Sequence, residues 1–152
     1  MLDVQQSHAV MAQMLWPQRA HVLKGEYTPG QLLSLIKHCD FAVGMRLHFL
    51  IFAALQRVPF VALPYSAKVG DLLNTLQLEM PPISLVNAGR LIAHIDRSWD
   101  RRNSLSERIK LVLPAMKRQA LKTNRMAVRL LTKSVSKERA AINLQRKTEE
   151  VT

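Results

Sequence analysis

Short apolar runs alternate with longer helical patterns along the first hundred residues of this 152-residue chain. Such runs suit buried strands, and they are separated by segments long enough for a crossover helix. This alternation predicts an α/β domain with a parallel sheet. The strands are predicted at 21–25, 41–44, 59–64 and 81–86, and the helices at 4–15, 28–39, 45–57, 66–78 and 87–100.

Individual residues in the sequence predict where several helices begin or are interrupted. Thr28 followed by Pro29 predicts an N-cap and a first helical residue, and Asn87 is a plausible cap further on. From Ser104 the spacing of apolar residues is helical again, and Ser104 with Glu107 is predicted to form a capping box. Pro114 is expected to kink or split this last helix.

Positive charge is concentrated in the last third of the chain. The formal net charge is +11; residues 1–95 hold seven Lys/Arg and five Asp/Glu (+2), whereas 96–152 hold fifteen and six (+9). We therefore expect a nearly neutral globular domain over 1–102 and a basic helical extension over 103–152. Its end, beyond Ser134, is polar and expected to fray.

Two predicted strand-to-helix turns carry side chains suited to an anionic ligand. Gly44, Arg46 and His48 lie at the first turn, and Tyr65 and Lys68 lie at the next. Ligands of parallel sheets bind beyond the carboxyl ends of the strands, where helix N-termini favour anions. Arginine grips phosphate or carboxylate with paired donors, and histidine transfers protons near neutral pH. If the two strands are neighbours, Arg46, His48 and Lys68 should converge on one pocket.

Each of these side chains also has a purely structural interpretation. Arg46 could pair with Asp40 or Asp71, and His48 could be a satisfied core histidine. Tyr65 is as well suited to packing as to ligand binding. The two cationic side chains Arg46 and His48 at one strand-to-helix turn, together with Lys68 at the next, nevertheless favour a functional site.

The stretch "CDFAVGMRLHFLIFAALQRVPFVALPYSAKVGDLL" resembles the signature region of the polysaccharide pyruvyl transferase family. That family combines "G-x-R-L-H", a strand ending in tyrosine, and a lysine twenty positions beyond the histidine, as His48 and Lys68 are here. The resemblance extends over roughly residues 1–115. One departure is "YSAK" at 65–68, where the family commonly has "YDPK".

The resemblance implies that this chain is the Rossmann-like, donor-binding C-terminal half of a GT-B-like fold, without the usual first strand of that half. In other members of the family, an N-terminal domain precedes this half. It implies transfer of the enolpyruvyl unit of phosphoenolpyruvate to sugar hydroxyls of a cell-surface glycan, giving a pyruvate ketal. Arg46 and Lys68 would bind the donor, with Gly44 and Tyr65 beside it, and His48 would be the catalytic acid or base. No cofactor or metal is expected, because the protein's own cations would hold the donor.

Other functions remain open at this point. The chain could be an inactive α/β module that binds anions, lipid or nucleic acid through its basic helix, or a nucleotide-sugar glycosyltransferase of GT-B type. The segment 104–133 could contact a membrane surface, whereas nucleic acid is the weaker expectation because no aromatic residue interleaves its cations. A separate N-terminal domain or a second copy of the chain are further expected partners.

The predicted location is the cytoplasm, including the inner face of the cell membrane. The single cysteine excludes an internal disulfide, and the first residues lack the pattern of a signal peptide.

Overall fold

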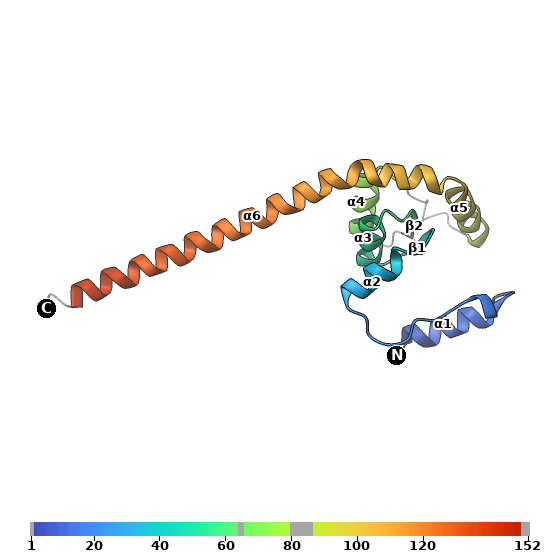
Figure 1. Ribbon diagram of the computed structural model, residues 1–152, viewed down its shortest axis with the longest axis horizontal. Helices are drawn as coiled ribbons and strands as arrows, with labels where there is room; N and C mark the ends of the chain where they lie inside the picture. The colour runs from blue at the N-terminus through green and yellow to red at the C-terminus, as the bar shows by residue number, and fades with distance from the viewer. Residues whose placement is uncertain (1, 64–65, 80–86, 150–152) are drawn as a thin grey trace.

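The computed structural model describes residues 2–63, 66–79 and 87–149, and the side chains within residues 4–133 of these ranges. Within these residues the fold is mixed α/β and mostly helical, with one small parallel sheet (Figure 1). The elements are α1 (Leu2–Ala12), the short 3-10 helix η1 (Pro17–Arg19), α2 (Pro29–Ile36), β1 (Ala42–Gly44), α3 (Leu47–Leu55), β2 (Phe60–Ala62), α4 (Ala67–Leu76), α5 (Ala88–Asp100) and α6 (Arg102–Glu149).

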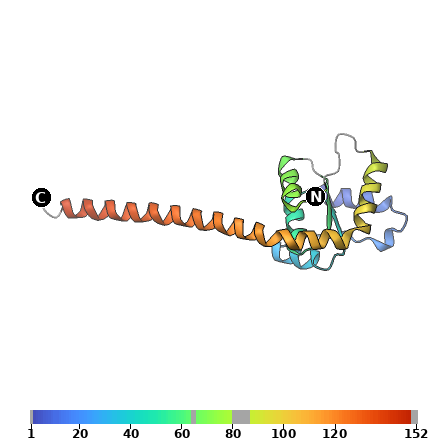
Figure 2. The same cartoon turned by 90° about the horizontal axis from the view of Figure 1, so that it is seen from above.

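The sheet joins β1 and β2 in parallel, with Ala42 opposite Phe60 and Gly44 opposite Ala62. Figures 1 and 2 show α3 and α4 on one side of the strands and α5 on the other, with α6 crossing all of them. The connection from β1 through α3 to β2 is the crossover that a parallel pair requires.

The core lies where α3, α4 and the first part of α6 meet the sheet. Leu50, Leu73 and Ile109 are fully or almost fully buried there, one from each of these three helices. Leu105 and Met116 pack against the same cluster. The packed body therefore includes the beginning of the basic segment, and α6 leaves it only beyond Met116.

The predicted helix starts at Thr28 and Asn87 are confirmed. The Thr28 hydroxyl accepts a hydrogen bond from the backbone N–H of Gln31, whose side chain reaches back to the Thr28 backbone. The Asn87 side chain accepts from the N–H of Arg90 at 2.9 Å. Both ends depend only on residues three apart, which is why local sequence suffices to predict them.

The strand predicted at 21–25 does not form; this segment is irregular. A strand is stable only when its backbone groups are paired, and no partner lies beside this segment within the described residues. The strand predicted at 81–86 lies outside the described residues. Of the predicted Rossmann-like sheet, the structure therefore shows two parallel strands, and the GT-B-like fold stays a prediction.

The predicted capping box at Ser104 is also wrong. Helix α6 already begins at Arg102, directly after α5, so Ser104 lies inside the helix and Glu107 pairs with Lys110 instead. The edge of the Trp99 ring meets Phe41 and its face carries the Arg102 guanidinium, 4.5 Å from the ring centre. The contact with Phe41 is tertiary, whereas Arg102 and Trp99 are only three residues apart; both contacts lie at the observed start of α6.

Helix α6 runs without a break through Pro114. This residue is exposed, so water can satisfy the backbone carbonyl that loses its partner. The axis changes direction where α6 leaves the body, and the helix continues as a single long rod (Figure 1). It reaches Glu149, whereas a frayed end was expected beyond Ser134; Ala, Gln, Glu, Lys and Arg in this stretch all favour helix.

Candidate functional site

The two turns that carry the predicted site residues leave the sheet at the same edge. The strands are parallel neighbours with Gly44 opposite Ala62, and the Leu63 N–H donates to the Gly44 carbonyl at 2.8 Å. The condition set by the sequence, that the two strands be adjacent, is therefore met. Neighbouring strands lie only about 4.8 Å apart, so the loops after them start side by side.

Two helices begin at this edge. Arg46 is the N-cap of α3 and Ser66 is the N-cap of α4, and neither side chain caps the helix that follows it. The N–H groups of the first turns therefore have no capping side chain from those residues. Together with the helix dipoles they make this edge favourable for negative charge.

The three predicted cations are all exposed at this edge. Arg46 precedes α3, His48 is the second residue of α3, and Lys68 is the second residue of α4. His48 and Lys68 form no ion pair with any other described residue. Their exposure rules out the interpretation of His48 as a core histidine. Tyr65 lies outside the described residues.

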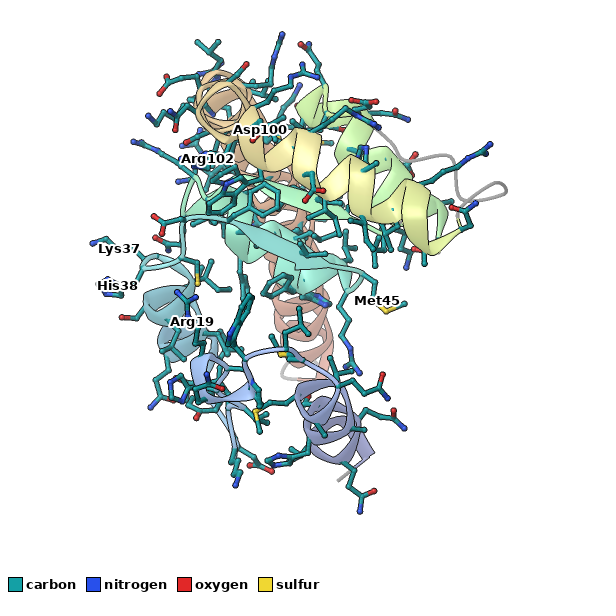
Figure 3. The ribbon with its side chains drawn as sticks, turned by 90° about the vertical axis from the view of Figure 1, so that its right-hand side faces the viewer. Arg19, Lys37, His38, Met45, Asp100 and Arg102 are labelled. Atoms are coloured by element: carbon teal, nitrogen blue, oxygen red, sulfur yellow. The ribbon has the colours of Figure 1, made fainter. Side chains whose placement is uncertain are left out.

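Figure 3 gives the orientation of this edge. Met45, the neighbour of Arg46, lies at the opposite end of the strands from Lys37 and His38. Since Lys37 and His38 come just before β1 in the sequence, Met45 marks the carboxyl edge. This is where parallel sheets place their ligands.

Gly44 has a structural reason to be glycine. A Cβ added there would lie 2.5 Å from Cδ1 and 2.7 Å from Cε1 of Phe49, closer than such atoms approach in proteins. The Phe49 ring therefore covers the end of β1 and fixes how α3 leaves it. Glycine at position 44 leaves room for this ring, and it is needed for the packing of the turn that carries Arg46 whether or not a ligand binds there.

Comparison with known families bears on this same segment. Residues 3–67 match the family model described as polysaccharide pyruvyl transferase. This segment is thus similar to the polysaccharide pyruvyl transferase family. No curated protein and no solved structure matches the chain significantly.

The match to the polysaccharide pyruvyl transferase family contains four of the five predicted site residues. It includes Gly44, Arg46, His48 and Tyr65, and it ends one residue before Lys68. The resemblance to this family that the sequence motif indicated is therefore confirmed. The match covers residues 3–67, a shorter stretch than the predicted range of roughly residues 1–115. The family is one of transferases.

Sequence reasoning missed a second polar cluster, at the other end of the sheet. A cavity of about 360 Å³ lies between the loop after α4 and the junction of α5 with α6. Its charged lining includes Arg97, Arg101 and Arg108. The helical spacing of Arg97 and Arg101 was visible in the sequence, but the residues that face them across the cavity come from a distant segment.

The described part of the chain supports neither a metal site nor a membrane-spanning helix. No group of three or more His, Cys, Asp or Glu side chains there is arranged to hold a metal ion. No helix among these residues has the length and apolar content to cross a membrane.

Proposed function

We propose that this chain supplies the phosphoenolpyruvate-binding part of a polysaccharide pyruvyl transferase. The observation that carries the proposal is the parallel pairing of β1 with β2, with Gly44 opposite Ala62, both inside the segment that matches the family. This register starts the Arg46 turn and the Lys68 turn at one edge. Two helix N-termini add to the positive potential there.

The donor matches this edge in charge and size. Phosphoenolpyruvate is a small molecule with a phosphate at one end and a carboxylate at the other. A guanidinium and an ammonium on adjacent turns would bind the two groups, Arg46 through its paired donors and Lys68 as a point charge. The protein's own cations hold the donor in this proposal, so that neither a metal nor a cofactor is required.

The reaction follows from the chemistry of the donor. A sugar hydroxyl attacks the enol carbon of phosphoenolpyruvate, loses its proton, and the methylene carbon gains one. A second hydroxyl of the sugar then attacks the same carbon and displaces phosphate, which leaves a pyruvate ketal and inorganic phosphate. His48 would contact the phosphate and move a proton as general acid or base. Cations held in place would stabilise the charge that develops on the departing phosphate.

The acceptor in this proposal is a glycan sugar. The reaction would take place in the cytoplasm, at the inner face of the membrane when the glycan is attached to lipid. A separate N-terminal domain or a second copy of the chain would complete the acceptor cleft.

Calorimetric titration of phosphoenolpyruvate into the protein tests the proposal. We expect saturable binding of one molecule per chain, with inorganic phosphate and pyruvate each binding more weakly because each offers only one of the two anionic groups. Absence of binding, or equal affinity for phosphate alone, would contradict a site built for this donor.

A second candidate, binding to an anionic lipid surface, is favoured by one feature of α6. Five cations follow one side of the helix at spacings of three and four residues; at about 100° per residue they fall within an arc of about 80°. All are exposed and none pairs with a described carboxylate. This basic ridge consists of Arg118, Lys122, Arg125, Arg129 and Lys133.

Exposed apolar residues lie beside the basic ridge. Leu121 and Val128 are more than half exposed on one flank, and Met126 and Leu130 on the other. No Phe, Tyr or Trp occurs in 103–152, so the stacking that holds single-stranded nucleic acid is not available from this segment. The combination of cations and aliphatic side chains suits a surface of anionic lipid.

Co-sedimentation with phosphatidylglycerol vesicles checks the lipid interaction. We expect the wild type to bind, with loss of binding at high salt and after replacing Arg125, Arg129 and Lys133 together by glutamine, because surface attraction of this kind is screened. The control carries glutamine at Arg19, Lys24 and Lys37, which removes the same charge elsewhere. Equal binding by both triple variants would show a general charge effect and contradict a role of the ridge.

A further inference from the structure

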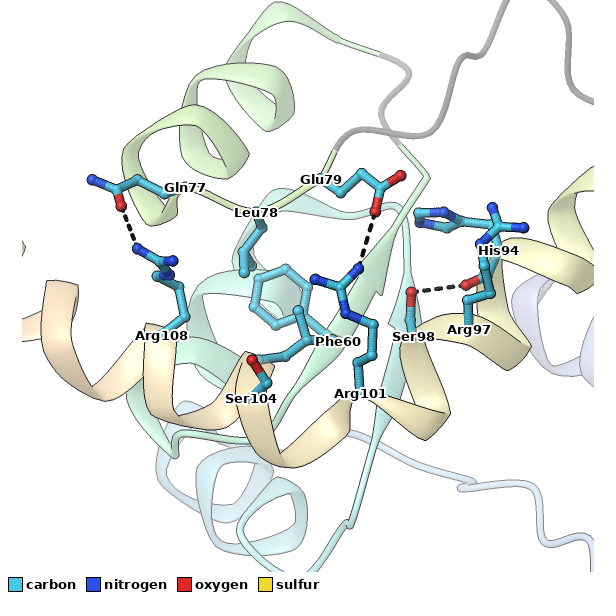
Figure 4. Close-up of a pocket in the computed structure, with 11 residues that line it drawn as sticks. Phe60, Gln77, Leu78, Glu79, His94, Arg97, Ser98, Arg101, Ser104 and Arg108 are labelled. Carbon is cyan, nitrogen blue, oxygen red and sulfur yellow. Dashed lines mark hydrogen bonds and ion pairs between the residues drawn. The ribbon is translucent and has the colours of Figure 1, made fainter.

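The cavity near the amino end of β2 is built from three separate parts of the chain. The loop after α4 supplies one wall through Gln77 and Glu79, while the end of α5 and the first turns of α6 supply the other. Phe60, the first residue of β2, forms the floor and is almost completely buried. Figure 4 shows these side chains around the cavity. Its volume, about 360 Å³, is within the range of small-molecule sites.

Arginine dominates the charged lining of this cavity. Three arginines, Arg97, Arg101 and Arg108, face one carboxylate, Glu79, a formal charge of +2. The Glu79 carboxylate lies 3.8 Å from the Arg101 guanidinium, and both side chains are largely exposed, so this pair is loose. The Arg97 guanidinium has no hydrogen bond or ion pair with any described residue.

Arg108 is held in place by a neutral partner. Its guanidinium donates to Oε1 of Gln77 at 2.7 Å, which orients the group without cancelling its charge. Gln77 itself adopts a left-handed backbone conformation (φ 54°, ψ 40°) at the end of α4, where glycine or asparagine is the usual residue. The side chain that orients Arg108 thus occupies a position at which a non-glycine residue is costly.

Uncharged groups complete the lining. The Ser104 hydroxyl and the Gln77 amide offer hydrogen bonds, and Leu78 and Leu105 add apolar surface next to Phe60. The His94 side chain is buried and borders the cavity; its backbone carbonyl accepts a hydrogen bond from the Ser98 hydroxyl at 2.8 Å. Guanidinium groups bind phosphate or carboxylate, hydroxyl and amide groups bind sugar hydroxyls, and apolar side chains pack on the C–H face of a sugar ring.

We infer that this cavity binds an anionic sugar, a sugar phosphate or a uronic acid. The two ligands share the required chemistry, a ring with several hydroxyls and one anionic group. The inference does not depend on the proposed transferase activity. Helix α4 starts at the carboxyl edge of the sheet and ends at the cavity, and its ten residues span about 15 Å, so the two sites are separate.

Titration calorimetry with glucose 1-phosphate, glucuronic acid and glucose tests the inference on the full chain. We expect at least one of the two anionic sugars to bind saturably and glucose not to bind. Replacing Arg97 and Arg108 together by glutamine should weaken that binding at least tenfold. Arg97→Gln alone should weaken it as well, and it removes no side-chain hydrogen bond or ion pair among the described residues, which keeps the result independent of folding.

Two controls separate this cavity from the rest of the basic surface. Arg19→Gln, which removes an exposed arginine outside the cavity, should leave binding unchanged. In proton NMR spectra the His94 ring signals should shift on titration in wild type, whereas a shift confined to His48 would place the ligand at the proposed donor edge. Binding that is unaffected by the Arg97 and Arg108 replacements, a loss of equal size in Arg19→Gln, or no binding of either anionic sugar would overturn the inference.

Discussion

Glutamine at position 46 is expected to weaken phosphoenolpyruvate binding by about tenfold to a hundredfold. Hydrogen bonds to charged groups contribute about 1.5–3 kcal/mol, and about 1.4 kcal/mol corresponds to a factor of ten in affinity. Arg46 is exposed at the N-cap of α3, at the carboxyl edge of β1. Its loss should therefore act on the ligand, and calorimetric titration of the donor into Arg46→Gln measures it.

Matched variants show whether this effect is specific. Lys68→Gln and His48→Ala should also weaken donor binding, since both residues begin helices at the same edge. Arg19→Gln and Lys37→Gln, exposed cations away from this edge, should bind like the wild type. A melting temperature near the wild-type value in each variant excludes unfolding. Donor binding that survives all three replacements at the edge would contradict the assigned residues.

The largest effect on stability is expected for Ile109→Ala. Ile109 is 0% exposed and joins the core cluster where α6 crosses α3 and α4. Truncation of a buried isoleucine to alanine removes apolar contacts and leaves a cavity, which costs about 2–5 kcal/mol. Urea unfolding monitored by circular dichroism gives the change in the free energy of unfolding.

Leu111→Ala is the control within the same helix. Leu111 is 76% exposed two residues further along α6, so its truncation should change the free energy of unfolding by no more than about 0.5 kcal/mol. Leucine and alanine both favour helix, so that helix propensity contributes little to the comparison. Similar effects of the two variants would mean that α6 does not pack on the core as described.

Much of the local structure was predictable because it depends on neighbours in sequence. The N-cap at Thr28, the cap at Asn87 and the two strands of the sheet follow from short-range hydrogen bonding and continuous apolar runs. The strand predicted at 21–25 fails for the opposite reason, because pairing with a distant segment decides whether a strand forms. The start of α6 before Ser104 likewise depends on packing around Trp99.

The two candidate sites differ in the same way. The proposed donor site at the carboxyl edge of the sheet was predictable because Gly44, Arg46 and His48 lie within one turn. In addition, parallel strands direct successive turns to the same edge. The structural reason for glycine at position 44 was not predictable from the sequence, because it is the packing of the Phe49 ring against Gly44. The arginine cavity was not predictable either, because its two walls come from segments at least 15 residues apart in the sequence, Glu79 and His94 being the nearest pair.

The amino-acid sequence alone determined the class of fold, the similarity of residues 3–67 to a transferase family and the uneven distribution of charge, because each depends on residues that are close together in the sequence. Only the tertiary structure decided which turns share an edge, where α6 leaves the core, and that Arg97 and Arg108 face one cavity. The physical reason is that these features arise from contacts between distant segments, whose free energy depends on the packing of the whole chain.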